Sequence, residues 1–432
     1  MKTESPRTRV FIAGIWRKGI SSESFGNSFD ELNELAKTAG VKVKGRYFQQ
    51  LEKPVAATFL GKGKIDEIAR NAREQQVSTL IFNDDLTPSQ ARNIANLTHC
   101  NVVDRTELIL DIFAKHARTH QAKLQVELAQ LEYAYSRLKN KWKHLSRIQG
   151  GIGFRGPGEK QIETDRREIN YRITILKKKL IEIRQTAEIK RKKRDSIINI
   201  SLVGYTNSGK STLFNLLARD NRYTANQLFA TLDSKTRKVV LPDEQDFVIS
   251  DTIGFIENIP HHLIESFNST LLDVRSADLL LHVVDITNPR LSEQMASVNA
   301  VLEDLNINQK NILLVFNKVD LVQGIGFSFL KKQLRAEYPD SVFISALTGE
   351  ELEQLQSHLS YFIQELYGLK HLIIPDILTE LLQYVRKSGV IFIEEYDEKN
   401  KQHKLDVKLS DSIYNNVVSQ IEKYHLLHYI NS

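Results

Sequence analysis

The residues with the clearest chemistry form a glycine-rich stretch near the middle of the chain. Four residues occupy the fixed places of the phosphate-loop pattern G-x-x-x-x-G-K-S/T: Gly204, Gly209, Lys210 and Ser211. The glycines let the backbone approach phosphate oxygens, so that successive N–H groups and a helix N-terminus face one anion. Lys210 adds a positive charge for the β and γ phosphates, and the Ser211 hydroxyl is a hard oxygen ligand suited to Mg²⁺. The stretch therefore predicts a nucleotide site.

Two further motifs follow short apolar runs, where the carboxyl ends of parallel strands are expected. In Asp251-Thr-Ile-Gly254, the Asp251 carboxylate can hold Mg²⁺ through water and the Gly254 N–H can contact a γ-phosphate. In Asn317-Lys-Val-Asp320, the Asp320 carboxylate can accept the ring N–H and the amino group of guanine, whereas adenine would present an acceptor there. The Ser-Ala dipeptide at 345–346 would complete the base pocket. These motifs predict a Mg²⁺-dependent GTPase.

A GTPase also needs a switch segment that contacts the γ-phosphate and releases it after hydrolysis. The polar stretch 221–237 contains three threonines, of which we select Thr231 for Mg²⁺ and the γ-phosphate. The predicted catalytic residues are Lys210, Thr231 and Gly254, and the predicted metal ligands are Ser211, Thr231 and Asp251. The predicted nucleotide contacts are Gly204, Tyr205, Thr206, Asn207, Ser208, Gly209, Lys210, Ser211, Thr212, Phe229, Thr231, Asp251, Gly254, Asn317, Lys318, Asp320, Ser345 and Ala346.

Composition limits the class of protein. The 432 residues are 41% hydrophobic and 26% charged, which is ordinary for a globular chain of two to four domains. No run approaches 18 apolar residues and no signal-peptide pattern occurs, so we expect neither a membrane span nor secretion. The single cysteine, Cys100, excludes an internal disulfide and a cysteine-based metal site. We expect a cytoplasmic protein, with peripheral association with a membrane left open.

Positive charge is concentrated in one segment. Residues 118–195 contain 21 Lys or Arg against 9 Asp or Glu, an excess of 12, whereas the whole chain carries only +6. The rest of the chain is therefore near −6. Basic charge gathered in one segment is typical of proteins that bind a polyanion, RNA or DNA before anionic lipid. A solvated helix face is the alternative interpretation.

The basic segment also has apolar residues at heptad spacing in two stretches, within 119–147 and 162–183. Two long helices with one apolar stripe each, joined by about ten residues, predict an antiparallel helical hairpin. An intermolecular coiled coil is the alternative. The tip at 149–160 holds five glycines around Phe154 and Arg155, which can stack on a base and pair with phosphate. A plain connector would explain the tip equally well.

The remaining parts complete an α/β chain of four regions. Residues 1–117 alternate apolar runs with helical patterns, which predicts a small parallel α/β domain in which Thr87 and Thr106 cap helices. Residues 118–195 form the hairpin, and residues 196–369 form a P-loop GTPase domain with a mainly parallel sheet. In the small α+β domain 370–432, Pro375 is expected to start a helix that Gly389 stops, followed by a β-hairpin and a last helix.

Taken together, five stretches resemble the HflX family of translational GTPases: GGIGFRGPGEKQIETDRR, GYTNSGKSTLFN, FATLD, DTIGF and NKVD. The resemblance covers about residues 10–370 and fades in the tail. It implies a protein similar to those that bind the large ribosomal subunit, reach its peptidyl-transferase centre with the glycine-rich tip, and split ribosomes stalled by stress. The residues that this directs to ribosomal RNA are Gly150, Gly151, Gly153, Phe154, Arg155 and Gly156.

The resemblance also bears on hydrolysis. FATLD corresponds to the family's first switch, which supports Thr231. Family members carry a hydrophobic residue after DxxG, where Ras-like GTPases have the glutamine that orients water, and here it is Phe255. We therefore expect a monomeric GTPase that uses GTP and Mg²⁺, is stimulated by the ribosome and does not bind DNA. The alternatives are a GTP-dependent ribosome-assembly or RNA-remodelling factor and a coiled-coil scaffold that only senses nucleotide.

Overall fold

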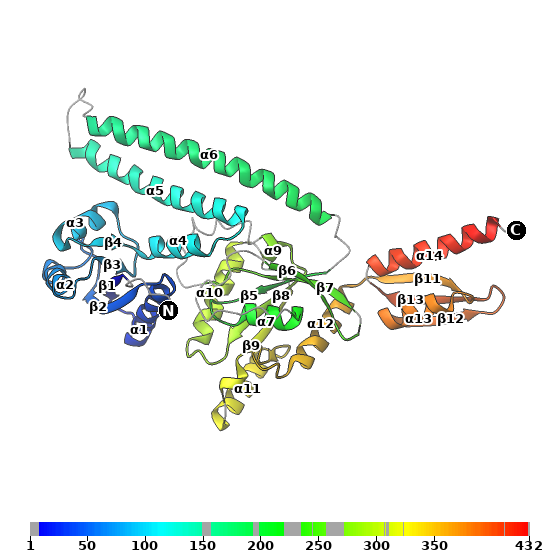
Figure 1. Ribbon diagram of the computed structural model, residues 1–432. Coiled ribbons are helices and arrows are strands. Elements are labelled where there is room, and N and C mark those ends of the chain that lie inside the picture. The colour runs from blue at the N-terminus through cyan, green and yellow to red at the C-terminus, as the bar shows by residue number, and fades with distance from the viewer. Residues whose placement is uncertain are drawn as a thin grey trace, which may run out of the picture. The chain divides into compact units, whose positions relative to one another are not determined.

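The structure is a computed structural model that describes residues 8–148, 157–192, 198–219, 235–243, 245–255, 272–305, 307, 311–322, 324–409 and 411–430. Its strands form three separate sheets (Figure 1). The described residues fall into two compact units, one up to Gln185 and the other from Thr186 onward. Among the described helices, none combines the length and apolar character that a bilayer span requires.

The first sheet is fully parallel, with the order β2-β1-β3-β4. Its strands are β1 (Arg9–Arg17), β2 (Lys42–Leu51), β3 (Thr79–Phe82) and β4 (Asn101–Val103). The helices between and after them are α1 (Ser22–Thr38), α2 (Lys62–Glu74), α3 (Pro88–Thr98) and α4 (Arg105–His116). The central strand β1 is buried from Val10 to Ile15, as expected for a strand covered on both faces. This confirms the predicted N-terminal α/β fold.

One predicted helix cap is wrong. Thr87 caps α3 in a capping box with Gln90, but α4 begins at Arg105, one residue before the predicted cap Thr106. Asp104 is its N-cap: the Asp104 carboxylate accepts the Glu107 N–H at 2.9 Å, and the Glu107 carboxylate accepts the Asp104 N–H at 3.4 Å. This reciprocal pair satisfies two N–H groups at the helix start, so Asp104 is the better cap. The Thr106 hydroxyl donates instead to Asp85.

The basic segment forms an antiparallel hairpin of α5 (His120–Ile148) and α6 (Pro157–Lys192), which lie side by side in Figure 1. At about 1.5 Å per residue, these helices are roughly 44 and 54 Å long. Their apolar stripes meet in one cluster: Leu124, Leu128, Ile173, Leu176 and Leu180. The tip is shorter than predicted, because α6 starts at Pro157 and includes Gly158 and Lys160. Proline suits a first helical position, where its missing N–H would have no partner.

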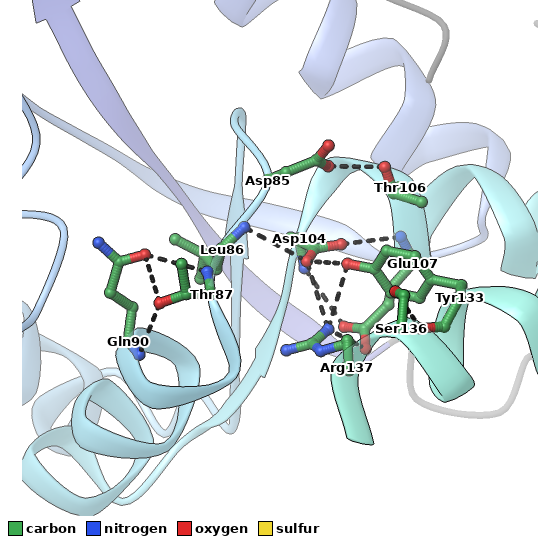
Figure 2. A network of polar contacts seen from close by, with 10 residues as sticks. All are labelled: Asp85, Leu86, Thr87, Gln90, Asp104, Thr106, Glu107, Tyr133, Ser136 and Arg137. Carbon is green, nitrogen blue, oxygen red and sulfur yellow. Dashed lines mark hydrogen bonds and ion pairs between the residues drawn. The ribbon is translucent and has the colours of Figure 1, made fainter. Parts of the chain in front are cut away.

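A polar network joins the middle of α5 to the start of α4 in the α/β part (Figure 2). The Asp104 carboxylate, only 1% exposed, accepts the Tyr133 hydroxyl. Arg137 contacts the same carboxylate at 3.3 Å and Glu107 at 2.5 Å. Burial raises the pKa of Asp104, while the hydrogen bonds from Tyr133 and Glu107 oppose that rise. Two residues of the hairpin thus satisfy a carboxylate buried at the start of α4.

The second sheet has the order β10-β9-β8-β5-β7-β6 and is parallel except for β6, which pairs antiparallel with β7. Its strands are β5 (Asn199–Val203), β6 (Lys235–Val240), β7 (Asp246–Asp251), β8 (Leu279–Asp285), β9 (Asn311–Asn317) and β10 (Val342–Phe343). The helical elements are α7 (Lys210–Ala218), α9 (Leu272–Ser276), α10 (Leu291–Asp304), η1 (Val319–Leu321), α11 (Ile325–Glu337) and α12 (Leu352–Leu366). This is the predicted P-loop GTPase fold.

The third sheet is antiparallel, with the order β11-β13-β12. It comprises β11 (Leu369–Pro375), β12 (Val390–Asp397) and β13 (Gln402–Lys408), with helices α13 (Thr379–Ser388) and α14 (Asp411–Ile430). The expectation that Pro375 starts a helix is wrong, because Pro375 ends β11 and α13 begins at Thr379. Leu372 and Ile374 alternate into the core as strand residues. The helix does end before Gly389, as predicted.

Candidate GTP site

The phosphate loop joins the end of β5 to the start of α7, and its two glycines cannot be replaced without strain. Gly204 has φ +145° and Gly209 has φ +98°, both in the region that side chains disfavour. A Cβ at Gly204 would lie 2.2 Å from the Val283 carbonyl oxygen. A Cβ at Gly209 would lie 2.0 Å from the Asn317 side-chain nitrogen. The loop is therefore packed against β8 and β9 with no room for side chains.

Lys210 is buried at the first position of α7. Its Nζ donates to the carbonyl oxygens of Gly204 at 3.1 Å and Tyr205 at 2.7 Å. Burial lowers the pKa of Lys210 to about 8, while the charge of Asp251 opposes that shift. Burial also lowers the pKa of His282 on β8 to about 4, with the Lys210 charge adding to the effect. His282 is therefore neutral near pH 7. The positive charge beside the phosphate loop is then that of the Lys210 ammonium.

The predicted Mg²⁺ ligands Ser211 and Asp251 lie together. The Ser211 hydroxyl donates to the Asp251 carboxylate at 2.7 Å, and Asp251 is fully buried at the end of β7. Both side chains offer hard oxygen atoms, which fit Mg²⁺. Among the residues that the structure describes, no group of three or more His, Cys, Asp or Glu could hold a metal by itself. The ion would therefore depend on phosphate and water oxygens as well, as Mg²⁺ commonly does.

Backbone contacts hold the DTIGF segment against the loop. Thr206 donates its N–H to the Phe255 carbonyl at 2.7 Å, and Phe255 donates to the Gly204 carbonyl at 3.1 Å. A Cβ at Gly254 would lie 2.9 Å from Lys210 Nζ, so glycine permits this approach. The side chain of Phe255 is 3% exposed and has no polar atom. It offers nothing that could orient an attacking water.

Two hydroxyls of the loop are placed for a ligand. Thr206 Oγ1 and Ser208 Oγ are buried and have no hydrogen-bond partner within the described part of the chain. A buried hydroxyl without a hydrogen-bond partner lowers the stability of the folded protein, and a phosphate oxygen would accept a hydrogen bond from it. This observation supports a phosphate group at the loop.

Asn317 ties the phosphate loop to the predicted base pocket. Its Nδ2 donates to the Ser208 carbonyl at 2.8 Å, and its Oδ1 accepts the Ala346 N–H at 2.8 Å. Ser345 is fully buried, and its hydroxyl oxygen accepts the Thr348 N–H at 3.1 Å. Asp320 lies half-buried on η1. The side chain of Asn317 is thus engaged with protein groups and holds the pocket together.

Sequence reasoning missed Asp285, the last residue of β8. One of its carboxylate oxygens contacts Lys318 Nζ at 2.6 Å, and the other accepts the N–H and the hydroxyl of Thr287 at 3.0 and 2.6 Å. Lys318 has φ +69°. The sequence did offer a signal for Asp285: its carboxylate ends an apolar run, and ligands of parallel sheets bind at the carboxyl ends of the strands.

Comparison with known proteins identifies the chain. Residues 26–114 match the family model "GTP-binding GTPase N-terminal", residues 116–194 match "GTP-binding GTPase Middle Region", and residues 199–318 match "50S ribosome-binding GTPase". The chain is 41% identical to GTPase HflX of Flavobacterium psychrophilum over 83% of this chain and 91% of the relative. It is 38% identical to GTPase HflX of Caldanaerobacter subterraneus over 93% of this chain and 92% of the relative. The chain belongs to the HflX family of GTPases.

Among solved structures, the chain is similar to a GTP-binding protein of the archaeon Sulfolobus solfataricus in complex with GDP. The identity is 26% over 82% of this chain and 98% of that chain, with a TM-score of 0.45.

In this HflX-family GTPase, most of the predicted site residues lie at the carboxyl edge of the second sheet. Asn207 is exposed with φ +63°, and Thr212 is half-buried in the first turn of α7. Phe229 and Thr231 lie outside the described residues, as do the tip residues 150–156. The roles of all these side chains and the bounds of the four regions remain predictions.

Proposed function

We propose that this HflX-family GTPase binds the large ribosomal subunit and splits ribosomes stalled under stress, hydrolysing GTP to GDP and phosphate. The observation that carries the proposal is the basic hairpin, whose two helices are tens of ångströms long and lie in the segment with an excess of 12 positive charges. Such an arm suits the phosphates of ribosomal RNA. The match to a family described as 50S ribosome-binding GTPases supports the same partner. The tip would then contact RNA at the peptidyl-transferase centre.

The geometry of the site supports the following roles in hydrolysis. Mg²⁺, when bound, neutralises charge on the β and γ phosphates, and Ser211 and Asp251 would hold it. Lys210 would exchange its contacts with the loop carbonyls for phosphate oxygens, and the Gly254 N–H would contact the γ-phosphate. Thr231 would complete the site from the switch segment. Water attacks the γ phosphorus, and the bond to the bridging oxygen breaks to leave GDP.

The ribosome would supply the means of orienting the attacking water. The buried, apolar side chain of Phe255 cannot orient water. Hydrolysis by the isolated protein is therefore expected to be slow and to be accelerated by the large subunit.

Sedimentation with purified ribosomal subunits tests the proposal. The protein should sediment with large subunits in the presence of a non-hydrolysable GTP analogue and much less with GDP. Light scattering should show that it splits intact ribosomes. A protein that binds only subunit precursors would be an assembly factor instead, and one that binds neither would refute the ribosomal role.

The proposal includes a monomer in the cytoplasm that does not bind DNA. Where the structure describes the side chains of the hairpin, Leu124 and Leu128 pack against Ile173, Leu176 and Leu180 of the same chain, so a coiled-coil partner is not required to cover these residues. Mass measurement in solution should give the monomer. A dimer that separates when the hairpin is deleted would favour the scaffold interpretation.

A further inference from the structure

The C-terminal sheet has one face that α13 and α14 do not cover. Both helices pack on the face that carries Leu372, Leu405 and Val407. The strand register places alternate residues on the other face, which we call the open face. It comprises Leu369, His371 and Ile373 from β11, Val390, Phe392, Ile393 and Glu395 from β12, and Lys404, Asp406 and Lys408 from β13.

Four large apolar side chains of the open face are about half exposed: Leu369, Ile373, Phe392 and Ile393, at 48 to 57%. The register shift between Ile391 and Ile393 brings Phe392 to this face, where the Lys408 ammonium lies 5.4 Å from the centre of its ring. Single exposed apolar residues are common on protein surfaces, but several gathered on one sheet face mark an interaction site.

Lys404, Asp406 and Lys408 of the open face have partners, and Glu395 adds a negative charge. Lys404 contacts Asp397 at 3.2 Å, His371 contacts Asp406 at 2.5 Å, and Lys408 contacts Glu365 at 3.2 Å. Residues 370–432 contain 8 Lys or Arg against 9 Asp or Glu, so the domain carries no excess of positive charge. The open face therefore lacks the attraction for phosphate that the hairpin has. This charge balance favours an apolar protein surface over RNA as the partner.

The size of the open face limits what it can do alone. Three strands of about seven residues cover on the order of 300 Å², given strand spacing and rise. A stable interface buries about 800 Å² on each partner, so this face is too small for a self-standing dimer. It suits a contact added to a complex that other parts of the chain already hold.

We propose that the open face docks onto an apolar patch of a protein of the large ribosomal subunit. The hairpin then contacts RNA, whereas the C-terminal domain contacts protein. The inference rests on the proposed ribosomal function, which supplies the larger complex.

Site-specific photocrosslinking tests which partner touches the open face. We would replace Phe392 with p-benzoylphenylalanine in the full chain, bind it to large subunits with a non-hydrolysable GTP analogue, irradiate, and identify the products by mass spectrometry. The control carries the same group at Tyr384, an exposed residue of α13, the helix that packs on the covered face. A ribosomal protein crosslinked from position 392 and not from 384 is the expected result. A crosslink to RNA or to a second copy, or no crosslink from a bound chain, would overturn the inference.

Charge substitutions measure the strength of the contact. Ile373→Glu combined with Phe392→Glu should weaken binding to large subunits about tenfold, because buried apolar anchors dominate such contacts. Affinity for GTP and the thermal midpoint should change little, since both side chains are half exposed in the parent. Tyr384→Glu, which adds one negative charge at an exposed position of α13, is the control. The relative loss of subunit affinity should persist at high salt, because the contact that the substitutions remove is apolar. An unchanged subunit affinity refutes the docking surface, whereas failure of the parent to bind subunits refutes the proposed function and this inference with it.

Discussion

Lys210 should couple nucleotide binding to the uptake of a proton. Burial holds its pKa near 8 in the nucleotide-free protein, against 10.5 for an ordinary lysine. Phosphate oxygens favour the charged form, so binding must raise this pKa. Between pH 8 and the higher pKa of the complex, the protein takes up a proton as it binds nucleotide.

We therefore predict proton uptake when GDP binds at pH 8.5, and an affinity that falls by at most about tenfold per pH unit above pH 8. Calorimetric titrations in two buffers with different ionisation enthalpies measure the number of protons. At this pH the phosphates of GDP are fully ionised and do not contribute. Proton release, or the same heat in both buffers, would contradict the assignment.

A second residue-scale prediction concerns Asp285, which we regard as a positioning residue for Lys318. Asp285→Asn keeps the shape but removes the charge that holds the Lys318 ammonium at 2.6 Å. Losing about 1 kcal/mol from this partly buried pair should weaken GDP binding about fivefold, mainly through faster dissociation. Turnover at saturating GTP should change little. A fluorescent GDP analogue measures both rates.

The control for Asp285 is Asp246→Asn, which removes an ion pair with Lys238 at the β6–β7 edge. It should leave nucleotide dissociation unchanged. If Asp285→Asn lowers only the unfolding temperature, its carboxylate has a purely structural role.

The motifs of the candidate nucleotide site could be placed together from the sequence, because they follow short apolar runs that end at one sheet edge. Lys210, Ser211 and Asp251 were placed by spacing alone. The spacing could not show that the Nδ2 and Oδ1 atoms of Asn317 both form hydrogen bonds within the protein, or that Asp285 lies next to Lys318. Those contacts depend on which strands become neighbours, and β8 and β9 are adjacent only in the folded sheet.

At the scale of elements, we expect the polar network between α4 and α5 to hold the hairpin against the N-terminal α/β part. Tyr133→Phe removes the hydroxyl that donates to the buried Asp104 carboxylate. Loss of a donor to a buried carboxylate should cost about 1 to 3 kcal/mol of stability in this unit. Hydrogen exchange in the middle of α5, around Tyr133, should accelerate, while GTP affinity should stay the same. Tyr171→Phe, on the exposed surface of α6, should have neither effect. Equal exchange in the two variants would show that the network does not hold the hairpin.

The elements that were predicted correctly from the sequence have either a clear hydrophobic periodicity or residues typical of a helix start. Heptad spacing predicted both hairpin helices, and Pro88 after Thr87 marked the start of α3. The strand β6 was missed because it is a mostly exposed edge strand within a polar stretch. In the tail, Pro375 was read as a helix start, because the pairing of β11 with β13 is formed by residues some thirty positions apart. The open face could not be predicted either, because it also depends on strand pairing, and a register shift in β12 brings Phe392 to it.

At the scale of the whole molecule, positive charge is concentrated in the hairpin and absent as an excess from the C-terminal domain, and we propose different partners for the two parts. The hairpin should bind RNA through phosphate contacts, which weaken steeply with salt. Lys178→Glu combined with Lys179→Glu, at exposed positions of α6, should reduce binding to large subunits about tenfold at low salt. The salt dependence of the remaining binding should be shallower. Lys399→Glu combined with Lys401→Glu, in the exposed β12–β13 turn, is the control and should bind as the parent does. Equal losses in both variants would mean that only net charge matters.

The last prediction separates the tip from the arm. Because α5 ends at Ile148 and α6 begins at Pro157, residues 150–156 can be replaced by seven glycines and serines without shortening either helix. The replacement leaves every residue of the nucleotide site in place, so GTP affinity should be unchanged. The basic arm is also intact, so binding to large subunits should fall only moderately. Splitting of intact ribosomes should be lost, because Phe154 and Arg155 are the side chains able to stack on a base and pair with phosphate there.

Arg155→Ala should have the same effect more mildly, since one phosphate or base contact contributes about 1 to 3 kcal/mol. Ribosome splitting is measured by light scattering, and subunit binding by sedimentation of the same samples. If the variant with the replaced tip splits ribosomes as well as the parent does, residues 150–156 are a connector and the basic helices are sufficient for splitting. If splitting and subunit binding are lost together, the tip is the main anchor and the basic helices only support it.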